Sequence, residues 1–314
     1  MWKKNKRLLD SEYKLEKIQI EDYYFNYPGK FDYEIIDNCY AYAKQIPDQQ
    51  NIHKIYETYY THSYARSFSR RWIDKIVKII YKNSILKLLA RATPLYTIIH
   101  HLYYGINQSN VKILDYGCGN GEQSRFVQEN NIWVGFDFDR KSVETGRKIG
   151  LEIFSDFDEL VVKCSAINGF DYVIMSHILE HVDDPIETLE MVGELLAEGG
   201  KILVYTPNIE AFGRRLTGKY WRGYEAPRHF HLFSPKSLIS LVAKSKKIEI
   251  LTAHSTTRGN RNFMIAFLIK KRIPQVLCKL IGYCYQLTSW FLSIIFASRA
   301  GEELFAVIKK KDVS

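Results

Sequence analysis

The sequence VKILDYGCGNGE at residues 111–122 decides the fold of this chain. Its apolar start, Val111–Asp115, has the length and character of a buried strand. The strand breaks into Gly117, Gly119 and Gly121, whose spacing lets the backbone turn tightly and lets a ligand approach without meeting a Cβ. Helix-compatible sequence follows, and the first N–H groups of such a helix would point at the ligand position beside the glycine turn.

The glycine turn differs from the fingerprint of nicotinamide dinucleotide sites. That fingerprint has a third glycine where this chain has Glu122, and here the acidic Asp115 precedes the glycines. Two carboxylates disfavour an anionic pyrophosphate between them. The turn therefore predicts a cofactor with a positive centre and an amino group.

Strands and helices alternate on both sides of this turn, which predicts a doubly wound, mostly parallel α/β sheet. Two apolar strands are expected near the ends of the domain, at Ile248–Ala253 and Leu304–Ile308. The other expected elements are strands at Trp133–Asp137, Leu151–Ser155, Phe170–Ser176 and Lys201–Tyr205, and helices at Ser142–Ile149, from Pro185 to Leu196 with Gly199-Gly200 as its end, and from Ser234 to about Ala243.

Two acidic residues follow strands of the expected sheet. Asp137 ends its strand 20 residues after Gly117, where a carboxylate can accept hydrogen bonds from ribose hydroxyls. Asp156 follows the next strand, and there the sequence leaves two readings open. It accepts from an adenine amino group, or it caps the helix that follows.

Four motifs in order carry a resemblance to a known family. VKILDYGCGNGE, GFDFD, FDYVIMSHILEHVDDP and LLAEGGKILVYTPN resemble class I S-adenosylmethionine-dependent methyltransferases, and PRHFHLFS at 227–234 is similar to a segment of the bacterial quinone and glycan types. The resemblance covers residues 111 to about 255 and implies a seven-stranded sheet with an antiparallel edge strand, with S-adenosylmethionine as cofactor. The cofactor-binding residues that we expect are Asp115, Gly117, Cys118, Gly119, Gly121, Asp137, Phe138, Asp156 and Ser176.

Residues 1–110 are expected to form a helical N-terminal region before a methyltransferase domain at 111–314. Over Arg66–Arg91, apolar residues recur at helical spacing among basic residues, which predicts one or two basic amphipathic helices. Residues 31–59 are similar to the end of a small zinc module that many relatives carry, but only Cys39 remains of its cysteines. Four soft ligands cannot be assembled from one cysteine, so no metal is expected.

Methyl transfer to a hydroxyl needs a base, and four histidines are candidates for it. His177 and His181 follow the strand at Phe170–Ser176, where open α/β sheets bind their ligands. His229 and His231 flank Phe230 in a strand-like alternation and so point the same way. The alternative for all four is a structural hydrogen bond.

Residues 209–233 lack clear periodicity and are predicted to form a loop or lid over the acceptor. Guanidinium groups beside aromatic rings suit a phosphate- or sugar-bearing molecule. The expected substrate-binding residues are Arg214, Arg215, Tyr220, Trp221, Arg222 and Arg228. No RNA-binding module is recognisable, so nucleic acid is not favoured as a partner.

The apolar stretch 273–297, within an insertion at 273–300, is long enough to span a bilayer. Lys279 and Gln286 interrupt it, and it lies between two strands of one sheet, so a helical hairpin is expected instead. The basic residues that flank the stretch, Lys270, Lys271, Arg272 and Arg299, could bind an anionic membrane surface. A helix that covers the sheet, or an oligomer contact, is the alternative.

Composition and charge limit the classes of protein that remain. The chain has 314 residues, of which 46% are hydrophobic and 25% charged, which excludes wholesale disorder. Five cysteines without a C-x-x-C pair argue against a disulfide framework. No secretory signal is visible, so we expect a cytoplasmic protein, peripheral at the inner membrane face if the insertion contacts lipid.

The net charge of +9 is unevenly distributed along the chain. Residues 111–208 carry 8 basic and 18 acidic side chains, whereas residues 209–314 carry 19 and 6. The basic ends suit an anionic partner. The sequence thus predicts O-methylation of a glycan, nucleotide-sugar or lipid-linked acceptor. A quinone or lipid-ring methyltransferase and a catalytically silent binding subunit are the alternatives.

Overall fold

The structure is a computed structural model, and it describes residues 2–9, 14–48, 50–56, 106, 108–127, 130–257, 259–296 and 301–311. The chain divides into two compact units, one made of residues 1–59 and 175–314 and the other of residues 60–174. The N-terminal residues thus group with the C-terminal half, and the predicted boundary at residue 110 is not the one found. The basic stretch Arg66–Arg91 lies outside the described residues.

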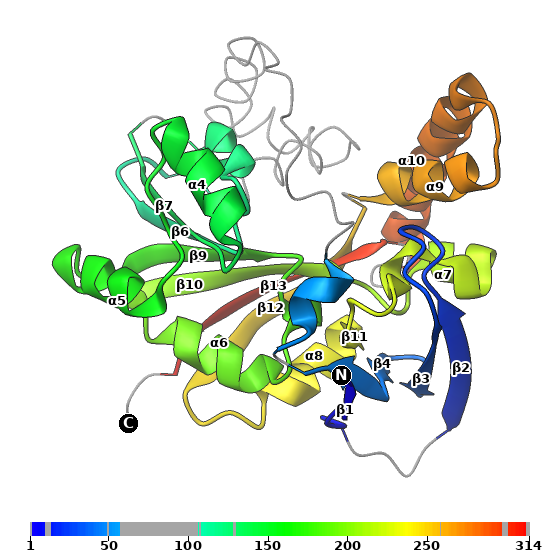
Figure 1. Cartoon of the computed structure of the whole chain (residues 1–314), viewed down its shortest axis with the longest axis horizontal. Coiled ribbons are helices and arrows are strands. Elements are labelled where there is room, and N and C mark those ends of the chain that lie inside the picture. Colours follow the sequence, from blue (N-terminus) through cyan, green and yellow to red (C-terminus); the bar gives the residue numbers. More distant parts are fainter. Residues whose placement is uncertain are drawn as a thin grey trace. The chain divides into compact units, whose positions relative to one another are not determined.

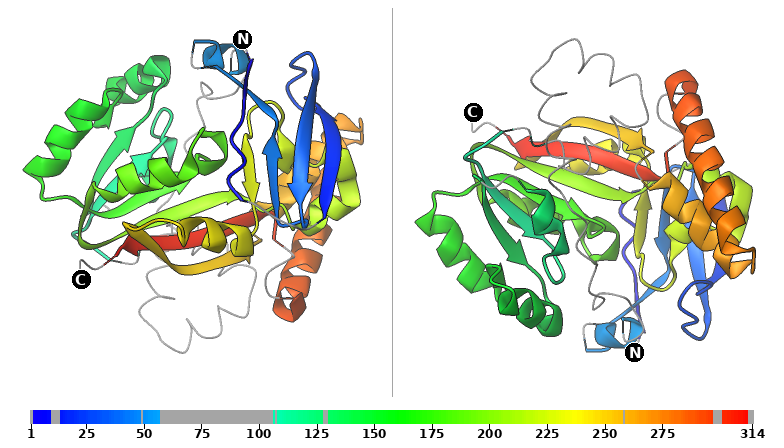
Figure 2. Two further views of the ribbon diagram at one scale, coloured as in Figure 1. Left: turned by 90° about the horizontal axis from the view of Figure 1, so that it is seen from below. Right: turned by 90° about the horizontal axis from the view of Figure 1, so that it is seen from above.

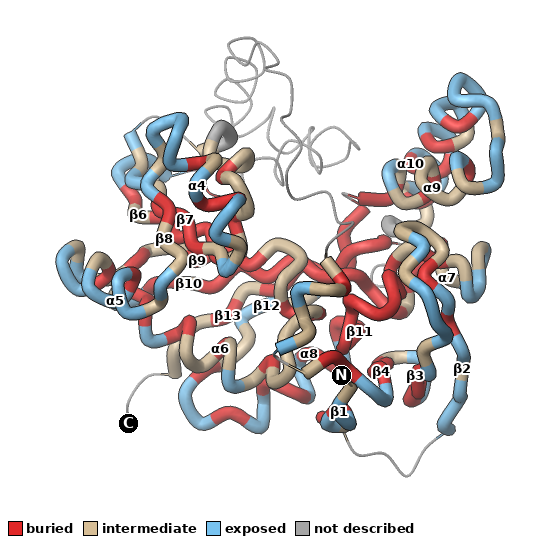
Figure 3. The backbone as a smooth tube through the Cα atoms, in the orientation of Figure 1, coloured by how far each residue is buried: buried red, intermediate tan, exposed pale blue. Residues whose placement is uncertain are grey.

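Seven strands form the main sheet, in the order β12-β13-β10-β9-β6-β7-β8 (Figure 1). Strand β13 runs antiparallel to both of its neighbours, so the antiparallel strand lies beside the edge strand β12. Burial is continuous over much of β9 and β10, as expected for strands covered on both faces (Figure 3). The strands are β6 (Lys112–Tyr116), β7 (Ile132–Phe136), β8 (Ile153–Phe154), β9 (Phe170–Ser176), β10 (Leu196–Pro207), β12 (Ile248–Thr256) and β13 (Glu303–Lys310).

The helices begin where the sequence provides capping residues. The side chains of Asp139, Asp156 and Asp184 each accept from backbone N–H groups at the start of a helix, and Ser234 forms a capping box with Ser237. These helices are α4 (Arg140–Lys148), α5 (Phe157–Ala166), α6 (Pro185–Gly193) and α8 (Pro235–Val242). Gly199 and Gly200 do not end α6, because they lie within β10.

The prediction of a helical N-terminal region is wrong for the described residues, which form strands. Strands β2, β3 and β4 join β11 in a four-stranded sheet of order β11-β4-β3-β2 (Figure 2). Their apolar residues bury against the segment 209–232. The elements are β1 (Trp2–Lys4), β2 (Leu15–Glu21), β3 (Lys30–Ile36), β4 (Tyr40–Ala43), β5 (Gln45–Pro47) and the 3₁₀-helix η1 (Ile52–Ile55).

The segment 209–233 is not the loop that the sequence predicts. Trp221, Tyr224 and Phe230 are buried in one core with Tyr33 and Ile35 of β3. The segment contributes aromatic residues to the core from an irregular backbone. Its sequence therefore has no helical or strand periodicity of apolar residues, although the segment is buried. The segment contains α7 (Phe212–Thr217), the 3₁₀-helices η4 (Gly218–Tyr220) and η5 (Arg222–Tyr224), and β11 (His231–Phe233).

The insertion between β12 and β13 forms two packed helices, α9 (Asn260–Lys270) and α10 (Gln275–Phe296) (Figure 2). The described part of the apolar stretch 273–297 is thus mainly the single long helix α10, which packs on α9, where the sequence predicts a hairpin within the stretch itself. In the part of the chain that the structure describes, no helix is both long and apolar enough to cross a bilayer.

Candidate active site

The glycine turn is held by the carboxylate of Asp137. The backbone N–H of Gly119 donates to one oxygen of Asp137 at 2.7 Å, and the N–H of Asp139 donates to the other at 2.8 Å. The structure thus brings together two of the predicted cofactor residues. Burial raises the pKa of Asp137, and the two N–H donors oppose that rise.

The turn has the shape that a bound cofactor requires. The backbone φ values of Gly117, Gly119 and Gly121 are 82°, 56° and 77°. Residues that carry a side chain rarely adopt these values. A Cβ built on Gly119 meets nothing within 4 Å, so the space above it is open to a ligand. The open backbone at Gly119 and the carboxylate of Asp137 beside it are compatible with the predicted S-adenosylmethionine site, and their contact with the cofactor stays a prediction.

The other predicted cofactor residues have different positions. Cys118 is buried and packs with Val143 and Ile153, and its sulfur lies where a Cβ on Gly135 would be. Phe138 is 72% exposed. Asp156 caps α5 through the N–H groups of Asp158 and Glu159, which is the second of the two readings. The turn is followed by the 3₁₀-helix η2 (Glu122–Phe126) and not by an α-helix.

A histidine cluster lies in the other unit, after β9. His177 has a left-handed backbone, with φ of 58°, directly after Ser176 at the strand end. Its Nδ1 lies 3.1 Å from Glu180 and its Nε2 lies 3.0 Å from Glu303. Glu180 is fully buried and also accepts from the Thr206 hydroxyl at 2.9 Å. Histidine is one of the residues that tolerate this backbone conformation, and both of its ring nitrogens here face carboxylates.

His181 and His229 form the second part of the cluster, with ring centroids 4.7 Å apart. Nδ1 of His181 lies 3.0 Å from the carbonyl oxygen of Arg228, and Nδ1 of His229 lies 2.6 Å from that of Gly223. A carbonyl oxygen only accepts, so Nδ1 of His229 carries the proton and its Nε2 keeps a lone pair. Nδ1 of His181 faces the Tyr56 hydroxyl as well as a carbonyl oxygen, so both tautomers of His181 satisfy its contacts.

The same cluster has the composition of a metal site. Ligand atoms of Glu180, His181 and His229 all lie within 4.8 Å of one another. The expectation that the chain binds no metal stays a prediction. Tyr56, which the sequence did not single out, contacts the cluster through its hydroxyl, 2.9 Å from Nδ1 of His181.

Comparison with known proteins identifies the family. A family model described as "Methyltransferase domain" matches residues 78–245, which is more than half of the chain. The chain belongs to this methyltransferase family. The predictions of a class I S-adenosylmethionine-dependent methyltransferase, of its fold and of S-adenosylmethionine as its cofactor are confirmed.

Individual relatives match the methyltransferase over part of its length. The "Ubiquinone biosynthesis O-methyltransferase" of Stutzerimonas stutzeri (strain A1501) is 26% identical over 177 residues, 53% of this chain and 72% of the relative. A protein of the same name from Cereibacter sphaeroides (strain ATCC 17029 / ATH 2.4.9) is 28% identical over 148 residues, 43% of this chain and 59% of the relative. A crystal structure of a "SAM dependent methyltransferase from Archaeoglobus fulgidus" has a TM-score of 0.41 and 17% identity, and the match covers 69% of this chain and 93% of that one.

The histidines of the methyltransferase differ in charge at neutral pH. Burial lowers the pKa of His181 and of His229 to about 4, so both are neutral. Burial also opposes the charge on His177, but the carboxylates of Glu180 and Glu303 outweigh it and raise the pKa of His177 to about 10. His177 is therefore a cation at neutral pH and is poorly suited to the role of base that the sequence predicts for it.

This charge difference predicts a pH dependence of stability. The folded pKa of His177 lies above the ordinary value of 6.5, so its contribution is complete below pH 6.5 and is lost as the pH rises toward about 10. We expect the free energy of unfolding to fall between pH 7 and pH 9. His177→Asn should flatten this fall, because asparagine tolerates the left-handed backbone and does not titrate. Urea unfolding at several pH values measures the slope, and an unchanged slope in the variant contradicts the assignment.

His231 and Arg228 lie in the protein interior, away from any substrate surface. His231 contacts the Tyr40 hydroxyl at 2.8 Å through Nδ1, and its Nε2 lies 3.3 Å from the Asp183 carbonyl oxygen. Both terminal nitrogens of Arg228 donate to one oxygen of Asp22 at 2.9 Å, and both side chains are fully buried. The prediction that these two residues touch the acceptor does not agree with their burial.

Other predicted substrate residues form a partly exposed group with residues that the sequence did not single out. We call Tyr23, Tyr24, Phe25, Tyr220, Arg222 and Lys271 the aromatic–basic cluster. Arg222 lies over the rings of Tyr24 and Phe25, at 5.3 and 5.7 Å from the centroids. Lys271 lies 4.5 Å from the centroid of Tyr220, which packs on Tyr23. Of the remaining two arginines, Arg214 donates to Asn38 at 3.1 Å, and Arg215 is exposed.

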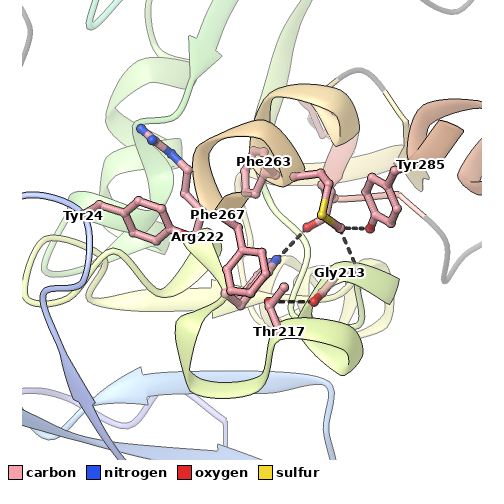
Figure 4. A pocket seen from close by; sticks show the side chains of 10 residues that line it. Tyr24, Gly213, Thr217, Arg222, Phe263, Phe267 and Tyr285 are labelled. Carbon is pink, nitrogen blue, oxygen red and sulfur yellow. Dashed lines mark hydrogen bonds between the residues drawn. The ribbon is translucent and has the colours of Figure 1, made fainter. Parts of the chain in front are cut away.

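A small pocket borders the aromatic–basic cluster, and Tyr24, Arg222, Phe263 and Phe267 line it (Figure 4). The buried carboxylate of Glu302 closes one side, and it accepts from the Trp221 indole N–H at 2.6 Å, from the Gly213 N–H at 2.9 Å and from the Tyr285 hydroxyl. Trp221 thus has a partner inside the protein. Burial raises the pKa of Glu302.

Proposed function

We propose that the methyltransferase methylates a hydroxyl of an anionic acceptor that carries a sugar, such as a glycan, a nucleotide-sugar or a lipid-linked sugar. The observation that carries this proposal is the aromatic–basic cluster. The tyrosine rings, of which Tyr23 and Tyr220 pack with a tilt of 55°, offer apolar surface to a sugar ring, and Arg222 and Lys271 offer charge to a phosphate. A lipid-linked acceptor would bring the protein to the inner face of the membrane.

His181 is the base in this proposal. S-adenosylmethionine supplies the methyl group, and the protein aligns the hydroxyl and removes its proton. His181 is neutral at physiological pH and half-buried, and its Nε2 has a lone pair in the tautomer whose Nδ1 donates to the Arg228 carbonyl oxygen. His229 has its proton on Nδ1, facing the Gly223 carbonyl oxygen, but it is more deeply buried, which makes it the weaker candidate.

A second acceptor class is favoured by the names of the relatives. Two of them are called ubiquinone biosynthesis O-methyltransferases, and a quinol ring also presents a hydroxyl. The two acceptor classes differ in charge, so variants of the cationic residues discriminate between them.

The test uses transfer of a labelled methyl group to nucleotide-sugars, polyprenyl-phosphate sugars and polyprenylated catechols. Replacement of both Arg222 and Lys271 by Met should cut turnover of a phosphate-bearing sugar by roughly tenfold or more, because each removes a charge-assisted contact. Affinity for S-adenosylhomocysteine, measured by calorimetry, should stay as in wild type. His181→Gln should cut turnover by roughly 100-fold or more, with the same cofactor affinity.

The controls separate the alternatives. Lys236→Met removes an exposed cation on α8 and should leave turnover unchanged. Methylation of the catechol alone, unaffected by the Arg222 and Lys271 variant, would replace the sugar acceptor by a quinone ring. Cofactor binding without transfer to any acceptor would favour the silent subunit. A loss of turnover on chelation would contradict the predicted absence of a metal.

A further inference from the structure

Helix α10 carries a strip of apolar side chains that face away from the protein. Val276, Leu280, Tyr283, Leu287 and Phe291 are 83%, 60%, 54%, 56% and 58% exposed. Their spacing of three or four residues places them along one side of the helix. We call these five residues the α10 strip. Figure 3 shows exposed residues along α10.

The opposite side of α10 is anchored, so the direction of the strip is fixed. Cys278 and Tyr285 are buried in a core with Met264 and Leu268 of α9. The side chain of Gln286 is buried as well, and it donates to the carbonyl oxygen of Thr257 at 2.8 Å. Helix α10 thus buries apolar side chains against α9 and also exposes large apolar side chains on its other side, which a helix that only faces water does not do.

The stretch of sequence that contains the strip carries only positive charges. Between residues 250 and 301 the sequence has seven lysines and arginines and no aspartate or glutamate. Lys279 is exposed on α10 beside the strip, and Lys271 and Arg272 are exposed at the turn between the two helices. Long basic side chains beside an apolar strip are the pattern of helices that lie in the surface of an anionic membrane.

We propose that the α10 strip and its basic border bind the surface of an anionic lipid bilayer, with α10 lying in the plane of the interface. The helix has 22 residues, which corresponds to about 33 Å of contact along the membrane. A protein partner would need acidic groups placed opposite each lysine and arginine, whereas an anionic bilayer presents negative charge everywhere along that length. The proposal goes beyond the methylation reaction and does not depend on the identity of the acceptor.

Sedimentation with vesicles tests the proposal on the full chain without any acceptor. Wild type should bind equimolar phosphatidylglycerol and phosphatidylcholine vesicles at least roughly tenfold more tightly than pure phosphatidylcholine vesicles. Replacement of Leu280 and Leu287 by Glu should weaken binding by roughly tenfold or more. The matched control replaces the exposed Val161 and Val162 of α5 by Glu, which changes the net charge equally and should leave binding as in wild type.

Salt and oligomeric state complete the test. High salt should release only part of the bound protein, because burial of the strip is not screened. Each variant is checked by S-adenosylhomocysteine binding, so loss of folding is distinguished from loss of lipid contact. Absence of wild-type binding to both vesicle types overturns the proposal. So does a wild-type dimer in light scattering that the Leu280 and Leu287 variant dissociates, because a second copy would then be what covers the strip.

Discussion

Gly119→Val should abolish measurable binding of S-adenosylhomocysteine. Gly119 has φ of 56°, a conformation that costs a β-branched residue about 1–3 kcal/mol. The new side chain would also fill the open space above the turn and displace the N–H that donates to Asp137. We expect a loss of affinity of roughly 100-fold or more, which corresponds to about 3 kcal/mol. Isothermal titration measures it.

The matched control for this prediction is Gly199→Val. Gly199 has φ of 70°, and a Cβ there also meets nothing within 4 Å, but it lies in β10 and belongs to the other compact unit. The backbone strain is therefore similar, and the cofactor cradle is untouched. The control should lose stability and bind S-adenosylhomocysteine as wild type does. Equal loss of binding in both variants would show that strain alone, and not the cradle, explains the effect.

Asp22→Ala should lower the free energy of unfolding by about 3–5 kcal/mol, the usual loss when one member of a buried ion pair is removed. The guanidinium of Arg228 would remain fully buried without its carboxylate partner. Asp22 also accepts from the N–H groups of Tyr24, Phe25 and Tyr27, so the turn between β2 and β3 loses its support. Chemical denaturation of wild type and variant measures the difference.

A double-mutant cycle separates the ion pair from the turn. Arg228→Met should restore part of the stability lost in Asp22→Ala, because no buried charge is then left uncompensated. The comparison variant Lys247→Met breaks an ion pair with Glu194 in which the two side chains are 59% and 61% exposed and the nitrogen and oxygen are 3.4 Å apart. That variant should cost less than about 1 kcal/mol. Additive losses in Asp22 and Arg228 variants would contradict a direct coupling between them.

Local patterns in the sequence predicted most of the main sheet. Val111–Asp115 and Phe170–Ser176 are strands as expected, since continuous apolar runs between glycines and polar residues specify buried parallel strands. The link between Gly119 and Asp137 follows from the same order of elements, because parallel strands end at one edge of the sheet. These features depend on residues close together in the sequence.

The remaining features depend on partners far away in the sequence. Arg228 reads as a substrate residue until its partner Asp22, 206 residues earlier, is known. His177 reads as a base until Glu303, 126 residues later, is placed beside it. Gly199 and Gly200 suggest a helix end, but strand pairing in β10 determines their conformation. Periodicity carries no information about such pairings.

The pairing of β4 with β11 has a consequence for synthesis on the ribosome. Tyr40 of β4 contacts His231 of β11, a residue made 191 positions later. The first strands therefore leave the exit tunnel long before the strand that completes their sheet. At typical rates of about 5–20 residues per second, β4 waits roughly 10–40 seconds with an open edge. During that interval the nascent chain is a natural client for a chaperone that shields strand edges.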